Sequence, residues 1–181
     1  MAASDDQVEN ESAAADQSPR LLALYDRALP QVYGYLAARV HDRTVAEDLT
    51  AETFLAAVRA VRDGKVPDLS IAWLVTVARN KLVDHWRRQA REERTLKLAG
   101  DPDADIVDDD TDARFDRLRT REVLAELGPH HRAALTLRYL DGLPVNDVAE
   151  HLDRTVHATE ALLVRARRAF RVLYDEGSGD D

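Results

Sequence analysis

Polar side chains recur within residues 70–91 in a pattern typical of one helix face. They are Asn80, Asp84, Arg87, Arg88 and Arg91. Trp73, seven residues before Asn80, borders the same face. Arginine side chains bind phosphates, while an amide and an aromatic ring can contact bases, so this face could bind nucleic acid. The alternative is a solvated face with Trp73 in the core, and spacing alone favours that alternative.

A second face of the same stretch is apolar and must be buried. Its members recur at spacings of three and four, the period of a helix. They are Ile71, Leu74, Val75, Ala78, Leu82, His85 and Trp86. The pattern predicts one helix from about Leu69 to Glu93.

Further helices are predicted before this stretch. Residues 1–18 are small, polar and acidic, which predicts disorder. Helical periodicity begins at Arg20 and continues to Val40, and Pro30 should kink this helix or start a new one. The segment 44–47, Thr-Val-Ala-Glu, has the form of a capping box and predicts a helix from near Val45 to about Val61.

The second half of the chain is also helical in pattern. Residues 96–114 are acidic and aperiodic, which predicts a flexible linker. Helices are expected over 115–127, 130–140, 145–152 and 156–174. We therefore predict an all-α protein of two small helical domains, the second a helix-turn-helix. The predicted divisions are a disordered acidic tail (1–18), a first domain (19–95), the linker (96–114), a second domain (115–175) and a disordered tail (176–181).

The last two predicted helices have the geometry of a DNA-binding helix-turn-helix. The longer one carries an apolar stripe formed by Val156, Thr159, Leu163, Ala166, Phe170 and Leu173. Its opposite face presents His157, Ala161, Val164, Arg165, Arg168 and Arg171, and the turn adds Arg154 and Thr155. A plain helical hairpin with a solvated arginine face is the alternative. The small Ala149 at the helix crossing favours DNA binding.

Charge and composition limit the function classes. The net charge is −9, but residues 79–97 hold seven Lys/Arg against three acids, so the acidic total hides basic helices. The chain has no cysteine, which suits a reducing cytoplasm and excludes thiol catalysis. We expect no signal peptide and no membrane insertion, because no apolar run approaches the roughly 18 residues of a span.

The sequence predicts neither an enzyme nor a metal or cofactor site. Asp101, Asp103 and Asp105 resemble the start of a calcium loop, but Ile106 replaces its glycine and Asp112 its final glutamate. The histidines lack metal-ligand spacing, and no glycine-rich phosphate loop is present. A metal-dependent nuclease would need carboxylates on a rigid scaffold, which this segment does not predict.

Three motifs occur together in a recognisable order. AEDLTAETFLAAVRA occupies 46–60, WLVTVARNKLVDHWRRQAR occupies 73–91, and LGPHHRAALTLRYLDGLPVNDVAEHL followed by RARRAF occupies 127–152 and 165–170. In this order the chain resembles bacterial RNA polymerase sigma factors of the small, extracytoplasmic-function (ECF) type. The resemblance covers about 20–94 and 117–174.

The resemblance implies a role for each segment. The first motif would dock on the clamp helices of core polymerase, through Asp48, Glu52, Phe54 and Leu55. The second would melt and bind the −10 promoter element, through Trp73, Asn80, Asp84, Arg87, Arg88 and Arg91. The helix-turn-helix would bind the −35 element, through Arg154, Thr155, His157, Glu160, Ala161, Arg165 and Arg168. The loop 63–70 would hold a flipped base.

The same resemblance implies partners and a location. It predicts binding to the β′ and β subunits of core polymerase and to promoter DNA, regulation by an anti-sigma factor, and a monomeric cytoplasmic protein when free. A free-standing helix-turn-helix regulator that binds duplex DNA as a dimer is the alternative, but it leaves residues 45–91 without a role.

Three parts of the chain depart from the family pattern. Ala51 stands where glutamine is usual, and Asp153 stands at the turn where glycine is usual. Asp tolerates the left-handed backbone better than most residues, so the turn should still form. The recognition helix carries Ala158-Thr159-Glu160 and Leu162 where family members often have Thr-Val-Lys and an arginine. Glu160 repels phosphate but can accept a hydrogen bond from cytosine N4, so the −35 contacts cannot be copied from the family.

Overall fold

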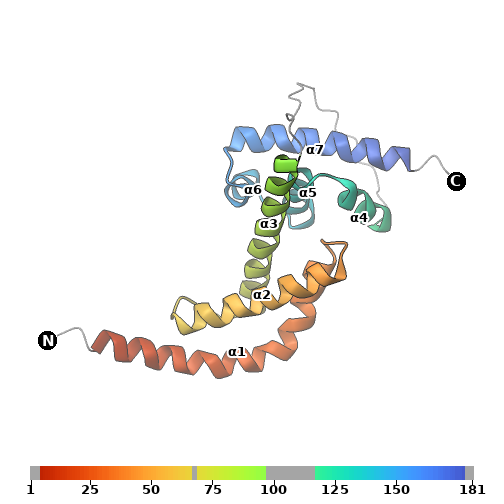
Figure 1. The fold of residues 1–181 in the computed structure, drawn as a ribbon. Coiled ribbons are helices and arrows are strands. Elements are labelled where there is room, and N and C mark those ends of the chain that lie inside the picture. Colours follow the sequence, from red (N-terminus) through yellow and green to blue (C-terminus); the bar gives the residue numbers. More distant parts are fainter. Residues whose placement is uncertain (1–4, 67–68, 97–116, 178–181) are drawn as a thin grey trace. The chain divides into compact units, whose positions relative to one another are not determined.

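The computed structural model describes residues 5–66, 69–96 and 117–177. These residues form seven α-helices and one π-helical turn, with no strand among them (Figure 1). The prediction of an all-α protein with two helical domains is confirmed. The contacts within the chain divide it into two compact units. The boundary between them along the sequence falls between Leu82 and Val83, inside one helix. The predicted linker, residues 96–114, lies almost entirely outside the described residues.

In the first unit, α1 (Asp5–Ala37) and α2 (Arg43–Arg62) run antiparallel side by side (Figure 1). Their shared core consists of buried apolar side chains. It contains Leu21, Ala28, Val32 and Leu36 from α1, and Ala46, Leu49, Phe54, Ala57 and Val61 from α2. The hydroxyls of Thr50 and Thr53 are buried and each donates to the carbonyl four residues earlier, so neither polar group is left unsatisfied.

Helix α1 differs from its sequence prediction at its start. It begins at Asp5, so residues 5–18 of the predicted tail are helical, while residues 1–4 lie outside the described part. Alanines 13–15 are strong helix formers, which accounts for the extension. Pro30 lies inside α1, whose ribbon bends in its second half (Figure 1), as a proline that removes one backbone hydrogen bond should produce.

The N-terminus of α2 is not the predicted capping box. Asp42 is the N-cap, and its Oδ1 accepts a hydrogen bond from the Thr44 backbone N at 2.7 Å. Glu47 pairs instead with Arg43, at 2.7 Å between Oε1 and Nε, and this contact raises the pKa of Arg43. Asp42 is the N-cap in place of Thr44 because its carboxylate already accepts from a backbone N–H of the first turn. The helix therefore begins two residues before the predicted start.

The third helix, α3 (Ile71–Leu96), is continuous, as predicted. Ser70 caps it, since its Oγ accepts from the Trp73 backbone N at 3.2 Å. The predicted apolar stripe is buried at Leu74, Ala78, Leu82 and Trp86. The stripe is wider than predicted, because Val83 and Ala90 are buried as well.

In the second unit, α7 (Val156–Glu176) packs against α4 (Arg117–Glu126), α5 (Pro129–Leu135) and α6 (Val145–Leu152) (Figure 1). One side chain fixes the end of α4. The half-buried Arg132 guanidinium donates to the backbone oxygens of Leu124, at 2.8 Å, of Ala125, and of Leu127, at 3.0 Å. Burial lowers the pKa of Arg132 from its usual range. Arg132 thus satisfies carbonyls that the ending helix leaves without partners.

The predicted helix over 130–140 changes character halfway. Thr136–Leu140 form a π-helical turn, and the Asp141 backbone N donates to the Thr136 carbonyl at 2.9 Å. Arg138 Nη1 donates to the Leu143 carbonyl at 2.8 Å across the turn that follows. Gly142, with φ of 70°, takes the left-handed backbone that this turn requires.

The helix-turn-helix forms within one residue or two of the predicted bounds. Asp153 adopts the left-handed conformation, with φ of 54° and ψ of 50°, as its position at the turn predicted. Thr155 caps α7, because its Oγ1 accepts from the Ala158 backbone N at 3.2 Å. Ala149 is buried where α6 packs on α7. The pattern predicts Val156 in the apolar stripe, but Val156 is 41% exposed, and Leu162 is buried instead.

Candidate functional site

The polar row of α3 is accessible to a partner. Asn80, Asp84, Arg88 and Arg91 are exposed, and Arg87 is half-buried. Asp84 Oδ1 lies 3.9 Å from Arg87 Nη1, a weak ion pair one turn apart. The other two arginines extend the positive charge along the helix. The row therefore presents an amide and three cations at the spacing the sequence predicted.

Trp73 has an intermediate position on α3. It is half-buried, whereas Trp86, one of the two tryptophans in the chain, is only 1% exposed. Trp73 is therefore neither a fully buried core residue nor a fully exposed one. Part of its side chain packs in the protein, and part stays accessible beside the polar row. The neighbouring loop, 63–70, includes two residues outside the described part, so its predicted role with a flipped base stays a prediction.

The four residues of the acidic docking prediction occupy different environments on α2. Asp48 and Leu55 are exposed, and Leu55 keeps 56% of its surface. Glu52 is half-buried, with Oε2 3.7 Å from Lys81 Nζ on α3. Phe54 is only 8% exposed, and its ring meets Tyr25 edge-on with centroids 4.7 Å apart. A partner that docks here would meet Asp48 and Leu55 first.

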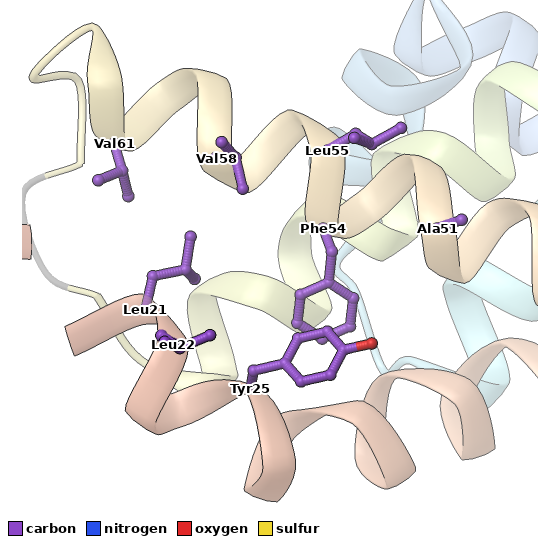
Figure 2. Close-up of a pocket in the computed structure, with 8 residues that line it drawn as sticks. All are labelled: Leu21, Leu22, Tyr25, Ala51, Phe54, Leu55, Val58 and Val61. Carbon is purple, nitrogen blue, oxygen red and sulfur yellow. The ribbon is translucent and has the colours of Figure 1, made fainter. Parts of the chain in front are cut away.

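An apolar groove lies beside these residues. Figure 2 shows its wall of α1 side chains facing the side chains of α2. The lining residues are Leu21, Leu22, Tyr25, Ala51, Phe54, Leu55, Val58 and Val61, around a volume of about 450 Å³. Leu22 is 74% exposed, and Val58 is also exposed. Of these residues, the sequence predicted a docking role only for Phe54 and Leu55. Leu21, Leu22 and Tyr25 come from a separate helix, so no pattern within α2 indicates them.

The outer face of α7 carries most of the predicted −35 residues. His157, Glu160, Ala161 and Arg168 are exposed. Arg154 and Arg165 are half-buried, so less of each is available than the pattern predicted. Thr155 serves as the N-cap, which uses its hydroxyl oxygen as an acceptor within the protein. The row of exposed residues begins in the first turn of α7, where recognition helices contact base edges.

An exposed aromatic residue near this row was not predicted. Tyr139, in the π-helical turn, is 54% exposed, and its hydroxyl lies 3.3 Å from Arg167 Nη1 on α7.

Within 5–66, 69–96 and 117–177, no group of three or more acidic or histidine residues could hold a metal ion. The aspartates at 101, 103 and 105 lie outside those ranges. None of the described helices is long and apolar enough to cross a membrane.

Comparisons with known proteins agree with this layout. Residues 24–92 match the Sigma-70 region 2 family, and residues 117–170 match the Sigma-70 region 4 family. The first segment contains α2 and most of α3, and the second contains α6 and most of α7.

Named relatives extend over most of the chain. The ECF RNA polymerase sigma factor SigL of Mycobacterium tuberculosis is 32% identical, over 91% of this chain and 94% of its own. The ECF sigma factor BldN of Streptomyces coelicolor is 33% identical over 92% of this chain, which spans 65% of BldN. The fold is similar to a solved structure of the sigma factor RpoE with the anti-sigma factor NepR from Bartonella quintana. That similarity has a TM-score of 0.52 at 20% identity, and it covers 92% of this chain and 99% of the other. The chain belongs to the extracytoplasmic-function RNA polymerase sigma factors.

Proposed function

We propose that this protein binds core RNA polymerase and directs it to promoters, where it recognises and melts the −10 element and binds the −35 element. The observation that carries the proposal is the pairing of two segments in one chain. The polar row of α3 lies within the region 2 match, and the exposed face of α7 lies within the region 4 match. The protein lends sequence recognition to polymerase and has no catalytic turnover of its own.

Each surface has a proposed role. The exposed Asp48 and Leu55, with Glu52 and the buried Phe54 behind them, dock on the clamp helices of core polymerase. An acidic helix face edged by an apolar residue suits a basic partner helix. The row from Asn80 to Arg91, with Trp73 at its edge, holds the −10 strand. Arginines neutralise phosphates there, while stacking on an aromatic ring contributes roughly 1–3 kcal/mol per base.

The helix-turn-helix supplies duplex recognition. Arg168 contacts phosphate, while His157, Glu160 and Ala161 face the major groove, with Arg154, Thr155 and Arg165 at the margin. The proposed domains are the predicted ones, 19–95 and 115–175, joined by an acidic connection. The proposed partners are the β′ and β subunits of core polymerase and promoter DNA. An anti-sigma factor is a further proposed partner, like the NepR that binds RpoE in the solved complex. The proposed location is the cytoplasm, where the free chain is a monomer.

Purification with core polymerase tests the proposal. The tagged full-length chain should bind purified core in a one-to-one complex and support transcription from specific start sites. Mapping those start sites after overexpression should reveal shared sequences near −10 and −35. A chain that fails to bind core, in the absence of any anti-sigma factor, contradicts the proposal.

The same experiment separates the alternative function. A dimeric helix-turn-helix regulator would bind duplex DNA without polymerase, at half-sites about one helical turn apart. Binding to such paired half-sites, together with no core binding, would favour that alternative. The exposed row on α3, which a dimeric regulator does not use, favours the sigma-factor function.

A further inference from the structure

Glu160 is an acid in a position that faces DNA in the proposed function. It lies in the second turn of α7 and is exposed. The rotation of α7 is fixed by its buried residues, Thr159, Leu162, Leu163, Ala166 and Phe170. This rotation places Glu160 outward, together with His157 one turn earlier and Ala161 beside it. Glu160 is therefore a part of the outer face of the helix.

The Glu160 carboxylate has no hydrogen bond or ion pair within the described part of the chain. Other exposed acids do have one: Glu47 pairs with Arg43 and Asp84 with Arg87 along their own helices. Glu160 has no lysine or arginine three or four residues away, since those positions hold Val156, His157, Leu163 and Val164. The free protein therefore leaves this carboxylate to water.

Bound DNA changes the environment of such a group. Phosphates repel the carboxylate, and docking in the groove strips its water, so binding is penalised unless a base supplies a hydrogen-bond donor. In the major groove, guanine presents only acceptors, N7 and O6, and thymine presents the acceptor O4. Adenine presents a donor at N6 beside an acceptor at N7, which repels the second carboxylate oxygen. Cytosine presents the N4 amine with no acceptor beside it.

We propose that Glu160 selects a cytosine in the −35 element by accepting a hydrogen bond from its N4 amine. This inference rests on the proposed function and deepens it, because it names one base. Selection occurs mainly by rejection: the unpaired carboxylate opposes every other base at that position. The small side chain of Ala161 leaves room for the base edge beside Glu160.

The test uses holoenzyme reconstituted from core polymerase and the full-length chain, on a promoter found by start-site mapping. Its −35 positions are randomised, and transcribed sequences are counted. The wild-type protein should require cytosine at one position by roughly tenfold over the other bases. Glu160→Gln and Glu160→Ala should relax the preference at that position alone. Glu176→Gln, which removes an exposed acid at the far end of α7, is the matched control and should change no preference.

A second measurement does not depend on the folding of a variant. A cytosine analogue that lacks the 4-amino group is placed at the selected position, and wild-type holoenzyme should lose roughly tenfold in binding. No cytosine preference, an unchanged preference in Glu160→Gln, or no effect of the analogue overturns the inference. Core binding and start-site choice are measured in the same samples. If they persist while the cytosine preference does not appear, this inference fails and the proposed function stands.

Discussion

Lys81 Nζ lies 3.7 Å from Glu52 Oε2, so an ion pair joins the proposed melting helix α3 to the proposed docking helix α2. Both side chains remain about one-third to two-fifths exposed, at 32% and 42%. A pair this accessible contributes little to stability, because water screens it. The pair therefore limits where the Glu52 side chain points, and it adds little to the stability of the unit.

Removing either partner separates a binding role of Glu52 from a structural one. Glu52→Gln and Lys81→Met should each lower the free energy of unfolding by less than about 1 kcal/mol, measured by urea denaturation. Core binding should weaken in Glu52→Gln but persist in Lys81→Met, which frees the carboxylate for a basic partner. Equal loss of core binding in both variants would show that the pair acts through structure.

Charge reversal at Asp48 tests the docking surface. Asp48 is exposed, so Asp48→Arg should preserve helix content by circular dichroism. It should weaken core binding by roughly a hundredfold, because a like charge would face the basic partner helix. Asp63→Arg, just beyond the end of α2, is the matched control and should bind core normally. Retained binding in Asp48→Arg would reject this docking face.

Arg88→Ala should slow promoter opening. The exposed Arg88 guanidinium belongs to the polar row of α3 and is proposed to hold a phosphate of the −10 strand. Opening is followed by the fluorescence of 2-aminopurine at the melted position. Arg62→Ala removes an exposed arginine from α2 and should open promoters at the wild-type rate. An unchanged opening rate in Arg88→Ala would show that the row is misassigned.

Arg168→Ala should weaken duplex binding by the −35 half. Loss of one phosphate contact reduces the slope of log K against log salt by about one. Holoenzyme affinity for closed promoter DNA, measured over a series of salt concentrations, gives that slope. Arg121→Ala, on α4, should leave the slope as it is. If both variants behave alike, Arg168 does not contact phosphate.

The left-handed backbone at Asp153, in the turn of the helix-turn-helix, predicts how substitutions at this position rank in stability. Asp153 has φ of 54°, a conformation that glycine adopts freely and a β-branched residue adopts at a cost. Asp153→Gly should stabilise the unit by roughly 0.5 kcal/mol, whereas Asp153→Val should destabilise it by about 1–2 kcal/mol. Asp153→Asn should be neutral. Thermal unfolding measures the order, and a valine variant as stable as wild type would contradict it.

Periodicity predicted the features that depend on one helix alone. The buried stripe of α3 and the bounds of α6 follow from which residues share a face, and this information is local. The left-handed turn at Asp153 was also predictable, because few residue types tolerate that backbone. The exposure of the polar row of α3 was predictable as well, because the opposite face of that helix is apolar and must be buried.

Features that depend on two segments were not predictable in this way. The groove needs Tyr25 and Leu22 of α1 beside α2, and no local pattern gives that pairing. The burial of Phe54 follows from the same packing. The N-cap differs from the prediction because Asp42 accepts from the Thr44 backbone N–H, the group from which Glu47 would accept in a capping box. The exposure of Val156 depends on how α7 lies on its neighbours.

The contact of Arg132 with the end of α4 determines where the chain can be cut. A fragment that begins at Gly128 would lose the carbonyls of Leu124, Ala125 and Leu127 together. Its half-buried guanidinium would then lack those three acceptors, and a desolvated cation without acceptors opposes folding. A smallest self-supporting DNA-binding piece must therefore start before α4, although the helix-turn-helix itself starts at Val145.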